Sequence, residues 1–581
     1  MSTPQPDHSP QALETHECPE RPSSLEPSEL GFVRRPMVSW LNPRQLVDTA
    51  FQALLSVIFG AYADKRQLQE LAVSEAYDQS DADELWLDYV ADLGDGWEPT
   101  YTVASLLARE KIELRSEDET HVTQRGRVLV MGGDQVYPVP NQSEYKNRML
   151  GPYRAALPCA HGEHPLLFAV PGTHDWYDGL VAFDSVFCHE NWIGGWRTRQ
   201  SRSYFALKLP HRWWLWGVDI QFGASVDKAQ LRYFSQEAAP QLEPGDRIVL
   251  CTANAEATTQ SDPEHSNRNL DYFERQIVQP TGAEIVLHLT SGLHHYCRYQ
   301  EPNGSRQLIT AGGGGAFLHP THQLPESLEL GEDERRRSYQ RMETYPSRAE
   351  SKRLRKRLWL LPFRNPAFAA LLGVINVQLA FMLNLHLEDA HVGIGVVELG
   401  RALWKSPTAF VLMLLMVILF GAMVKFAHDA GGLSRLLLGL VHSILQLASV
   451  TGVMIVSSRL SSSFGLEGAP SLIVFLGLVA VIGGFVGALG FAGYLWATNC
   501  LGFHANEAYA PLRVMDFKSF LRLHFDADGN LTVFPIGIDR VCRRWGLSRK
   551  SAPEDPWLEP EDEDVKPHLI EEPVHIGHRP R

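Results

Sequence analysis

Between residues 85 and 322, short apolar runs alternate with glycines and polar residues. The runs occupy residues 85–90, 127–131, 166–170, 213–218, 248–251, 285–289 and 308–311. Apolar runs of this length, bounded by glycine and polar residues, are typical of buried β-strands that feed loops. Segments of helical character, residues 102–109, 143–156 and 269–279, lie between several of the runs. The pattern therefore predicts an α/β domain with functional loops at its strand ends.

A second pattern follows, because the chain carries four uncharged apolar segments at residues 366–385, 406–424, 436–458 and 472–498. Each is close to the roughly 20 residues that a helix needs to cross a bilayer. They predict a four-helix transmembrane domain that places the chain in a lipid bilayer. His442 falls within the third segment, where we favour an interhelical hydrogen-bonding role over a functional site. Gly483 and Gly487 are spaced for close helix packing.

The charge next to the first apolar segment predicts the orientation. Residues 335–357 contain ten Lys or Arg and two Glu, and they immediately precede that segment. Basic residues flanking a span remain on the cytoplasmic side. Lys425 and Arg435, between the second and third segments, agree with this. We therefore expect an integral protein of the plasma (inner) membrane, with its head and C-terminus in the cytoplasm.

The chain ends have their own patterns. Residues 43–65 show helical apolar spacing that predicts an amphipathic helix packed on a domain, and residues 513–538 alternate as in a β-hairpin. The predicted organisation is a disordered tail at 1–30, an amphipathic N-terminal helical region at 31–84, the α/β domain at 85–334, a basic juxtamembrane linker at 335–365, the transmembrane domain at 366–503, a C-terminal hairpin segment packing on the head at 504–550 and an acidic disordered tail at 551–581.

Net charge and cysteine usage narrow the function classes. The chain has 53 Lys and Arg against 68 Asp and Glu, a formal charge of −15, which disfavours general nucleic-acid binding. Its seven cysteines are scattered without CxxC spacing, so neither a zinc site nor a redox pair is indicated. A reducing compartment fits this usage best.

Metal-ligand and acid/base residues concentrate in four strand-end loops, DLGDG (92–96), GGDQVYP (132–138), PGTHDWYDG (171–179) and SGLHHY (291–296). Carboxylates and imidazoles can hold a metal ion that polarises a phosphoryl group and lowers the pKa of a bound water. Asp92, Asp134 and His294 suit that task. His174, with Asp175 beside it, suits proton donation to a leaving group.

These loops are similar in order and spacing to those of the calcineurin-like metallophosphoesterase superfamily, and more narrowly to a membrane-attached bacterial and plant branch. The motifs GGAFLHPTH (314–322), HANEAY (504–509), LRLH (521–524) and PIGIDRV (535–541) also resemble that branch. The resemblance covers residues 85–322 and 504–546. It implies a two-layer β-sandwich flanked by helices, with two metals at the strand ends. It makes Asp92 and His294 ligands of the first metal, and Asp134 the bridging carboxylate.

The chain departs from that pattern at the second metal. Thr173, Ala253 and Gly292 stand where the resemblance expects Asn, His and either His or Asp. Gly94 replaces the first-loop His, and Asp95 beside it is a further candidate ligand. His288, His295, Asn254 and Glu256 could supply substitutes, although we favour structural or solvent-facing roles for them. Residues 312–315, all glycine, form either an anion-binding nest or, as we favour, a plain tight turn.

The sequence therefore leaves three functions open. The first is a membrane-anchored metallophosphoesterase that hydrolyses a phosphoester with one divalent ion, Mn, Fe or Zn, rather than two. The second is a catalytically inactive relative that binds a phosphorylated ligand or a partner through the same cleft, or serves as a scaffold. The third, a transporter or channel with a regulatory head, is disfavoured because the spans contain no paired charges or broken helices.

Overall fold

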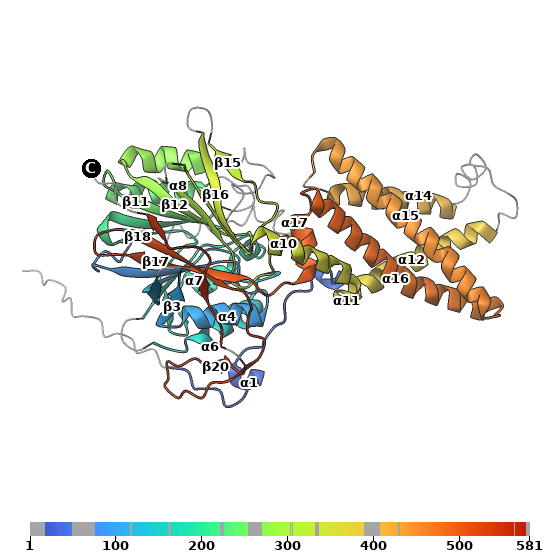
Figure 1. The fold of residues 1–581 in the computed structure, drawn as a ribbon, viewed down its shortest axis with the longest axis horizontal. Helices are drawn as coiled ribbons and strands as arrows, with labels where there is room; N and C mark the ends of the chain where they lie inside the picture. The colour runs from blue at the N-terminus through green and yellow to red at the C-terminus, as the bar shows by residue number, and fades with distance from the viewer. Residues whose placement is uncertain are drawn as a thin grey trace, which may run out of the picture.

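The protein has a head built on two β-sheets and a bundle of long helices that extends from one side of it (Figure 1). The computed structural model describes residues 18–48, 76–116, 119–160, 164–220, 226–253, 270–302, 304, 306–331, 336–388, 407–427, 430–562 and 564–576.

The first sheet of the head joins strands from both sides of the helical bundle in the sequence. Its order is β21-β18-β17-β2-β5-β6-β8-β7, with β22 also paired to β18. β2, β5, β6 and β8 run parallel, while β17 pairs antiparallel with β2. The hairpin that follows the apolar helices therefore belongs to the head's own sheet. The bounds are β2 Leu85–Val90, β5 Val128–Met131, β6 Leu166–Ala169, β7 Trp192–Ile193, β8 Trp196–Thr198, β17 Lys518–Phe525, β18 Leu531–Ile538, β21 His568–Leu569 and β22 Val574–Ile576.

The second sheet has the order β1-β9-β10-β11-β12-β14-β13-β16-β15, with β10, β11, β12 and β14 parallel. Its strands are β1 Tyr77–Asp78, β9 Phe205–Leu209, β10 Trp213–Val218, β11 Arg247–Thr252, β12 Glu284–Thr290, β13 Tyr296–Gln300, β14 Gln307–Ala311, β15 Ser327–Leu330 and β16 Arg337–Tyr345. Parallel strands bring their carboxyl ends to one edge, so the loops that follow them meet there.

The two sheets pack face to face across one apolar core. Trp213 lies against Phe525 and Phe168 against Phe205, with ring centroids 5.4 and 4.9 Å apart. Helices cover both outer faces, as the mixed α/β pattern predicts. The first sheet carries α4 (Trp97–Leu107), η1 (Lys146–Leu150), α6 (Gly151–Ala156) and α7 (Val181–Phe187), and the second carries α8 (Lys228–Tyr233), η4 (Phe234–Ala238) and η7 (Glu274–Val278).

The N-terminal segment wraps the head, contrary to the expectation of a disordered tail at 1–30. Cys18 forms a disulfide with Cys159, and Arg21 donates a hydrogen bond to the Pro556 carbonyl. The segment continues through α1 (Pro27–Leu30) to residues 43–48, which are helical. For residues 18–30 the expectation is therefore wrong, because buried apolar side chains such as Leu30 anchor a segment whose composition alone suggests disorder. The expected amphipathic helix lies outside the described residues beyond position 48.

A disulfide between two of the cysteines disagrees with the reducing compartment that the cysteine usage suggested. Cys18 and Cys159 are 141 residues apart in sequence, so spacing alone could not reveal the pair.

The acidic C-terminal segment is likewise structured, so the expected disordered tail is wrong for residues 551–562 and 564–576. β20 (Leu558–Pro560) pairs with β19 (Trp545–Leu547), and β21 and β22 pair with β18. Glu571 accepts hydrogen bonds from the buried Arg298 and from Tyr296. Backbone pairing and charge neutralisation offset the repulsion that the composition implies.

The helical bundle contains α12 (Pro366–Glu388), α14 (Pro407–Phe426), α15 (Gly432–Ser463) and α16 (Gly468–Cys500). Among the described residues, α15 and α16 are long and apolar enough to cross a membrane. A third span is formed if the helical segment 348–364 and residues 366–381, which meet at 63°, count as one. Length and apolar composition therefore support two of the four predicted spans, or three if the bent pair counts as one.

Glycines let α12 and α16 approach closely. A methyl group at Gly483 would lie 2.8 Å from Asn376 Cβ, and one at Gly373 would lie 2.4 Å from the Ala480 carbonyl. His442 meets Gln446 of its own helix, and its ring lies 4.1 Å from that of Tyr494 on α16. The interhelical contact of His442 is therefore aromatic rather than the expected hydrogen bond.

The head and the bundle meet at α10 (Arg348–Leu354), η10 (Arg355–Leu360), α11 (Leu361–Arg364) and α17 (Ala505–Tyr509) (Figure 1). Buried apolar side chains of these elements, of α12 and α16 and of neighbouring segments of the head form one cluster, here called the junction core. Its members are Leu318, Leu354, Leu358, Leu361, Phe368, Ala488, Phe491, Ala492, Tyr494, Leu495, Ala508, Tyr509, Leu512 and Val514. Leu318 comes from the head, so this core joins the two parts directly.

Candidate metal centre

Two adjacent loops bring the first two candidate ligands together. The DLGDG loop follows β2, the GGDQ loop follows β5, and backbone hydrogen bonds from Asp92 to Gly133 and from Leu93 to Asp134 continue the parallel pairing past the strands. Asp92 and Asp134 have φ of +57° and +49°, a region that Asp tolerates better than most residues. The turn of each loop thereby fixes the position of its carboxylate.

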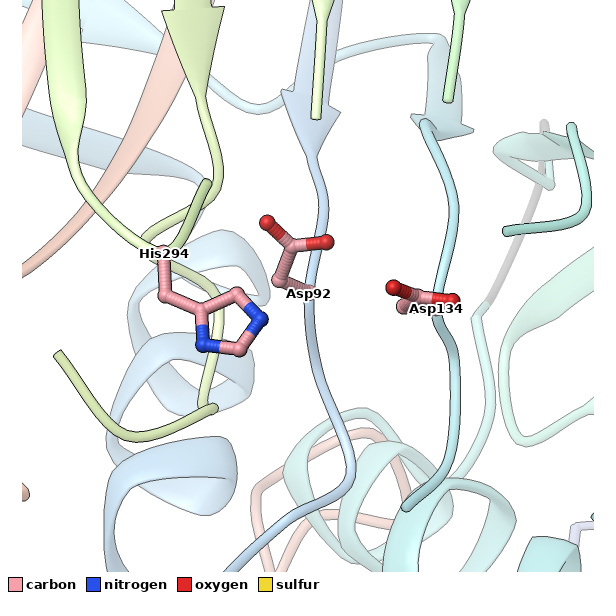
Figure 2. Close-up of side chains that lie close together, drawn as sticks. All are labelled: Asp92, Asp134 and His294. Carbon is pink, nitrogen blue, oxygen red and sulfur yellow. The ribbon is translucent and has the colours of Figure 1, made fainter. Parts of the chain in front are cut away.

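Asp92, Asp134 and His294 form the group that the sequence predicts as metal ligands. Each offers one ligand atom, and these atoms lie within 4.8 Å of one another. All three side chains are buried. Figure 2 shows Asp92 between the other two, with the imidazole approaching from the SGLHHY loop.

Hydrogen bonds prepare His294 for metal binding. Its Nδ1 lies 2.7 Å from the Phe317 carbonyl, which can only accept, so Nδ1 carries the proton. Nε2 therefore presents a lone pair, which the Tyr137 hydroxyl meets at 2.9 Å. Burial lowers the pKa of His294 well below its ordinary value, and the nearby His319 acts in the same direction. The imidazole is thus neutral, as a metal ligand must be.

The two carboxylates favour a cation between them. Burial raises the pKa of Asp92 well above its ordinary value, and the neighbouring Asp134 raises it further. Two close, buried carboxylates ionise together only when a positive charge compensates them. Two carboxylate oxygens and one imidazole nitrogen suit Mn, Fe or Zn. The donor set therefore fits a divalent metal ion.

His174 lies beside this group rather than in it. Its backbone N–H donates to Asp134 Oδ1 at 2.7 Å, and its Nδ1 meets the Pro138 carbonyl at 2.7 Å. The side chain is partly exposed. Nε2 is consequently the atom left to exchange a proton with a bound molecule.

The side chain of Asp175, next to His174 in the sequence, is fully buried. Its buried carboxylate accepts hydrogen bonds from the Tyr145 hydroxyl at 2.6 Å and from the amides of Gly172 and Gln135 at 2.8 and 3.3 Å. These contacts tie the PGTHDWYDG loop to the GGDQ loop. The Asp175 carboxylate, on the loop that carries His174, is therefore buried and engaged by protein donors.

Asp95, expected as a further ligand, points its carboxylate elsewhere. Its two oxygens accept the backbone N–H groups of Val38 and Phe317, at 2.7 and 3.1 Å. Asp95 therefore joins the N-terminal segment to the loop that orients His294. The resemblance suggested a ligand because Asp95 lies beside Gly94, which replaces the first-loop His, but the turn directs the side chains of Asp92 and Asp95 apart.

The positions of the second metal carry short side chains. Gly292, with φ of +81°, donates its N–H to both oxygens of Asp92 at 3.0 Å. Ala253 is buried, and its methyl group would lie 2.5 Å from a Cβ at Gly133. Gly292 offers only a hydrogen, Ala253 only a methyl group and Thr173 only a hydroxyl group, and none of these is a strong metal ligand.

Of the proposed substitutes, the two histidines that the structure describes do not join the ligand group. His288 is in β12, where its Nε2 meets the Thr252 hydroxyl at 2.9 Å. His295 is buried without joining Asp92, Asp134 and His294. Asn254 and Glu256 lie outside the described residues.

The glycines of residues 312–315 serve close packing. None of them has positive φ, so they do not form the alternating nest geometry. A Cβ at Gly312 would lie 2.0 Å from Asp92 Oδ2, and one at Gly313 would lie 2.1 Å from Ser519 Oγ. The tight-turn interpretation is therefore the better one.

Sequence reasoning missed three residues of the site. Tyr137 bridges His294 and Asp134, and its place in the GGDQVYP motif was a usable signal. Lys518 of β17 donates to the Ala316 carbonyl, and burial lowers its pKa to about 8. Trp40 packs its ring 5.8 Å from that of His174. Lys518 and Trp40 reach the site only through tertiary folding, so local pattern could not reveal them.

Comparison with known proteins identifies no family. No protein-family model and no curated protein matches the chain. Among solved structures, "GAP50 the anchor in the inner membrane complex of Plasmodium" matches 41% of this chain and 74% of its own, at 14% identity and a TM-score of 0.30. A structure of PhoD matches 42% of this chain and 59% of its own, at 12% identity and a TM-score of 0.26. Because both TM-scores are low, the functional argument rests on the site itself.

Proposed function

We propose that this protein is a membrane-anchored, metal-dependent phosphoesterase of the calcineurin-like type, with one complete metal position. The observation that carries the proposal is the buried group of Asp92, Asp134 and His294, whose ligand atoms lie within 4.8 Å of one another. The resemblance of the strand-end motifs supports the same function.

The chemistry follows from the donors and from His174. When bound, the divalent ion would polarise the phosphoryl group and lower the pKa of a water molecule. Asp92, Asp134 and His294 would hold that ion. His174 donates its Nδ1–H to the Pro138 carbonyl, and when the imidazole carries a second proton at Nε2 it would pass that proton to the leaving oxygen and become neutral. Asp175 and Tyr145 would keep the loop of His174 in place.

Metal analysis combined with a phosphodiester assay tests the proposal. The purified protein should contain one divalent ion per chain and should hydrolyse bis(4-nitrophenyl) phosphate slowly. Asp134→Asn should remove both properties. Asp227→Asn is the matched control, since Asp227 caps α8 away from the site and Asn caps a helix equally well. Full metal content and activity in Asp134→Asn would contradict the proposal.

A catalytically inactive phosphoesterase-like protein is the second candidate. Gly292, Ala253 and Thr173 favour it, because two-metal enzymes use both ions to stabilise the attacking and leaving oxygens. Such a protein would bind inorganic phosphate through its metal without hydrolysing any ester. Measurable turnover that disappears in His174→Ala would exclude it.

For the membrane part we propose four spans, adding α12 and α14 to α15 and α16. Their lengths of 23 and 20 residues and their apolar composition support this. The packing of α12 on α16 through Gly373, Gly483 and Gly484 supports it as well.

We also propose that the head and the C-terminus face the cytoplasm of a cell with a plasma (inner) membrane. The basic stretch 335–357 supports this orientation. The Cys18–Cys159 disulfide argues against it, because disulfides persist in oxidising compartments. A reporter that is active only outside the cytoplasm, fused after residue 550, decides the question. We expect no reporter activity, and strong activity would reverse the orientation.

A further inference from the structure

The helical segment that joins the head to α12, residues 348–364, has the side chains of a lipid–water interface. Its exposed basic residues are Lys352, Arg353, Lys356 and Arg357. Its exposed apolar residues are Trp359, Leu360 and Phe363, at 48%, 47% and 70%. Basic and large apolar side chains exposed together on one short segment are typical of helices that lie in the headgroup region. We call residues 348–364 the interfacial segment.

The geometry of the segment agrees with that position. It meets residues 366–381 of α12 at 63°, and α12 packs along α16. If α12 and α16 cross the bilayer, the interfacial segment turns away from the span direction and toward the membrane surface.

Aromatic contacts mark the depth of the surface along α16. The ring of Trp359 lies 6.3 Å from that of Trp496, and the guanidinium of Arg355 lies 5.6 Å over Trp496. Phe363 contacts Phe485, which precedes Trp496 by 11 residues, or about 16 Å along α16, so the C-terminal end of the segment enters the hydrocarbon while its basic residues stay at the surface. Because Trp prefers the interface and Phe the hydrocarbon, the boundary between them lies near Trp496.

The loop of residues 314–322 lies just outside that boundary. His322 Nε2 is 3.2 Å from Asn499 Oδ1, and Asn499 follows Trp496 by three residues. At a rise of about 1.5 Å per residue this is about 4.5 Å along the helix axis. The headgroup layer is about 5–8 Å thick on each side of the hydrocarbon. His322, at the end of the loop, therefore falls within the headgroup layer.

The same loop is part of the metal centre. The Phe317 carbonyl holds His294 Nδ1 at 2.7 Å, and the ring of His319 stacks on His294 at 4.1 Å. Leu318, between them, is buried in the junction core with Leu358 and Leu361 of the interfacial segment. One loop thus contacts a metal ligand on one side and the membrane-side core on the other.

The N-terminal segment completes the wall between the site and the membrane. Trp40 packs against His174 and Phe317, with ring centroids 5.8 and 5.6 Å apart. The next residue, Leu41, packs against the junction core. In Figure 1 this blue segment lies beside α11. The partly exposed wall of the site is therefore apolar and continuous with the membrane side.

We propose that the metal centre works at the membrane surface, and that its substrate is a phosphoester carried by an amphiphile in the same bilayer. This inference rests on the proposed function, whose substrate class it supplies. The apolar part of the substrate remains in the lipid beside Phe363 and Trp496. Its phosphoester lies in the headgroup layer, within reach of the loop that orients His294.

Two esters with the same reacting group test the proposal. 4-Nitrophenyl methyl phosphate and 4-nitrophenyl hexadecyl phosphate share the leaving group and differ only in the alkyl chain. With the full chain in lipid nanodiscs, kcat/KM should be at least about 10-fold higher for the hexadecyl ester, because the chain concentrates the substrate in the bilayer. Hydrolysis of the hexadecyl ester should also fall as the lipid dilutes it at constant bulk concentration. Equal kcat/KM for the two esters would overturn the inference.

A pair of substitutions assigns the preference to the interfacial segment. Phe363→Ser should reduce the ratio of hexadecyl to methyl ester hydrolysis by about 10-fold, the equivalent of removing one aromatic side chain from the lipid. Val122→Ser removes a similarly exposed apolar side chain from β4 (Thr120–Gln124), in the head. It should leave the ratio unchanged. A ratio unaffected by Phe363→Ser would contradict the membrane position of the segment.

Metal content separates failure of this inference from failure of the proposed function. Hydrolysis of both esters at equal rates by a metal-containing protein retains the function and rejects the amphiphile. If neither ester is hydrolysed, the proposed function fails. The binding of two non-hydrolysable phosphonates then tests whether the site lies at the membrane surface. Metal-dependent binding of hexadecylphosphonate in preference to methylphosphonate then supports a surface site, while equal binding or none of either rejects it.

Discussion

Substituting Gly312 by Ala tests whether Asp92 is a metal ligand. A Cβ at position 312 would lie 2.0 Å from Asp92 Oδ2, whereas real Cβ atoms essentially never approach a heavy atom within 3.0 Å. Either the loop or the carboxylate must therefore move by at least about 1 Å. Ligand distances in metal sites hold to about 0.2 Å, so a shift of this size disrupts coordination. We expect metal affinity to fall by at least about 10- to 100-fold, the range for disturbed ligand positioning.

Metal retained after dialysis against graded chelator, measured by elemental analysis, gives the affinity. Gly313→Ala is the matched control, because its Cβ would lie 2.1 Å from Ser519 Oγ, an equally close contact that touches no candidate ligand. Both variants should lose thermal stability, but only Gly312→Ala should lose metal affinity. Wild-type affinity in a folded Gly312→Ala protein would refute the assignment of Asp92.

Three further predictions follow from the head. Arg522→Met should destabilise the head by about 3–5 kcal/mol in thermal unfolding, because it leaves the buried Asp88 without its ion-pair partner. Arg544→Met removes an exposed ion pair and should change the stability little. Equal effects of the two substitutions would contradict the role of the buried pair. His174→Ala should lower phosphodiester turnover by about 100-fold with metal retained, and unchanged turnover would exclude His174 as the proton donor. Burial, with Arg306 adding to it, lowers the pKa of His288 to about 4, below the unfolded value of about 6.5. His288 therefore contributes full stability above about pH 6.5, which is lost as the pH falls toward 4, and His288→Gln should flatten the dependence of unfolding temperature on pH in that window.

Local sequence pattern predicted much of the head because its strands and loops are local features. Apolar runs marked β2, β5 and β6, and the loops that follow them carry Asp92, Asp134 and His174. Parallel pairing then brings those loops to one edge, as their order along the chain suggests. His294 joined the group because its loop follows β12, another parallel strand.

The features that sequence reasoning missed depend on contacts between distant segments. Lys518 reaches the centre from a strand that follows the helical bundle, and Trp40 reaches it from the N-terminal segment. Cys18 meets Cys159 across 141 residues. Asp95 lies beside the position of the missing first-loop His, yet the amides of Val38 and Phe317 determine the direction of its carboxylate. Composition cannot supply such partners, and it therefore also misjudged the acidic C-terminal segment.

Metal stoichiometry tests the central claim most directly. Metal-free protein in nanodiscs can be titrated with Mn²⁺ while electron paramagnetic resonance measures the free ion. Asp92, Asp134 and His294 provide one position, whereas Thr173, Ala253 and Gly292 provide no strong ligands for a second. The titration should therefore end at one tightly bound Mn²⁺ per chain. Two tightly bound ions would show that other residues complete a second position, and no bound ion would remove the basis for a metal-dependent activity.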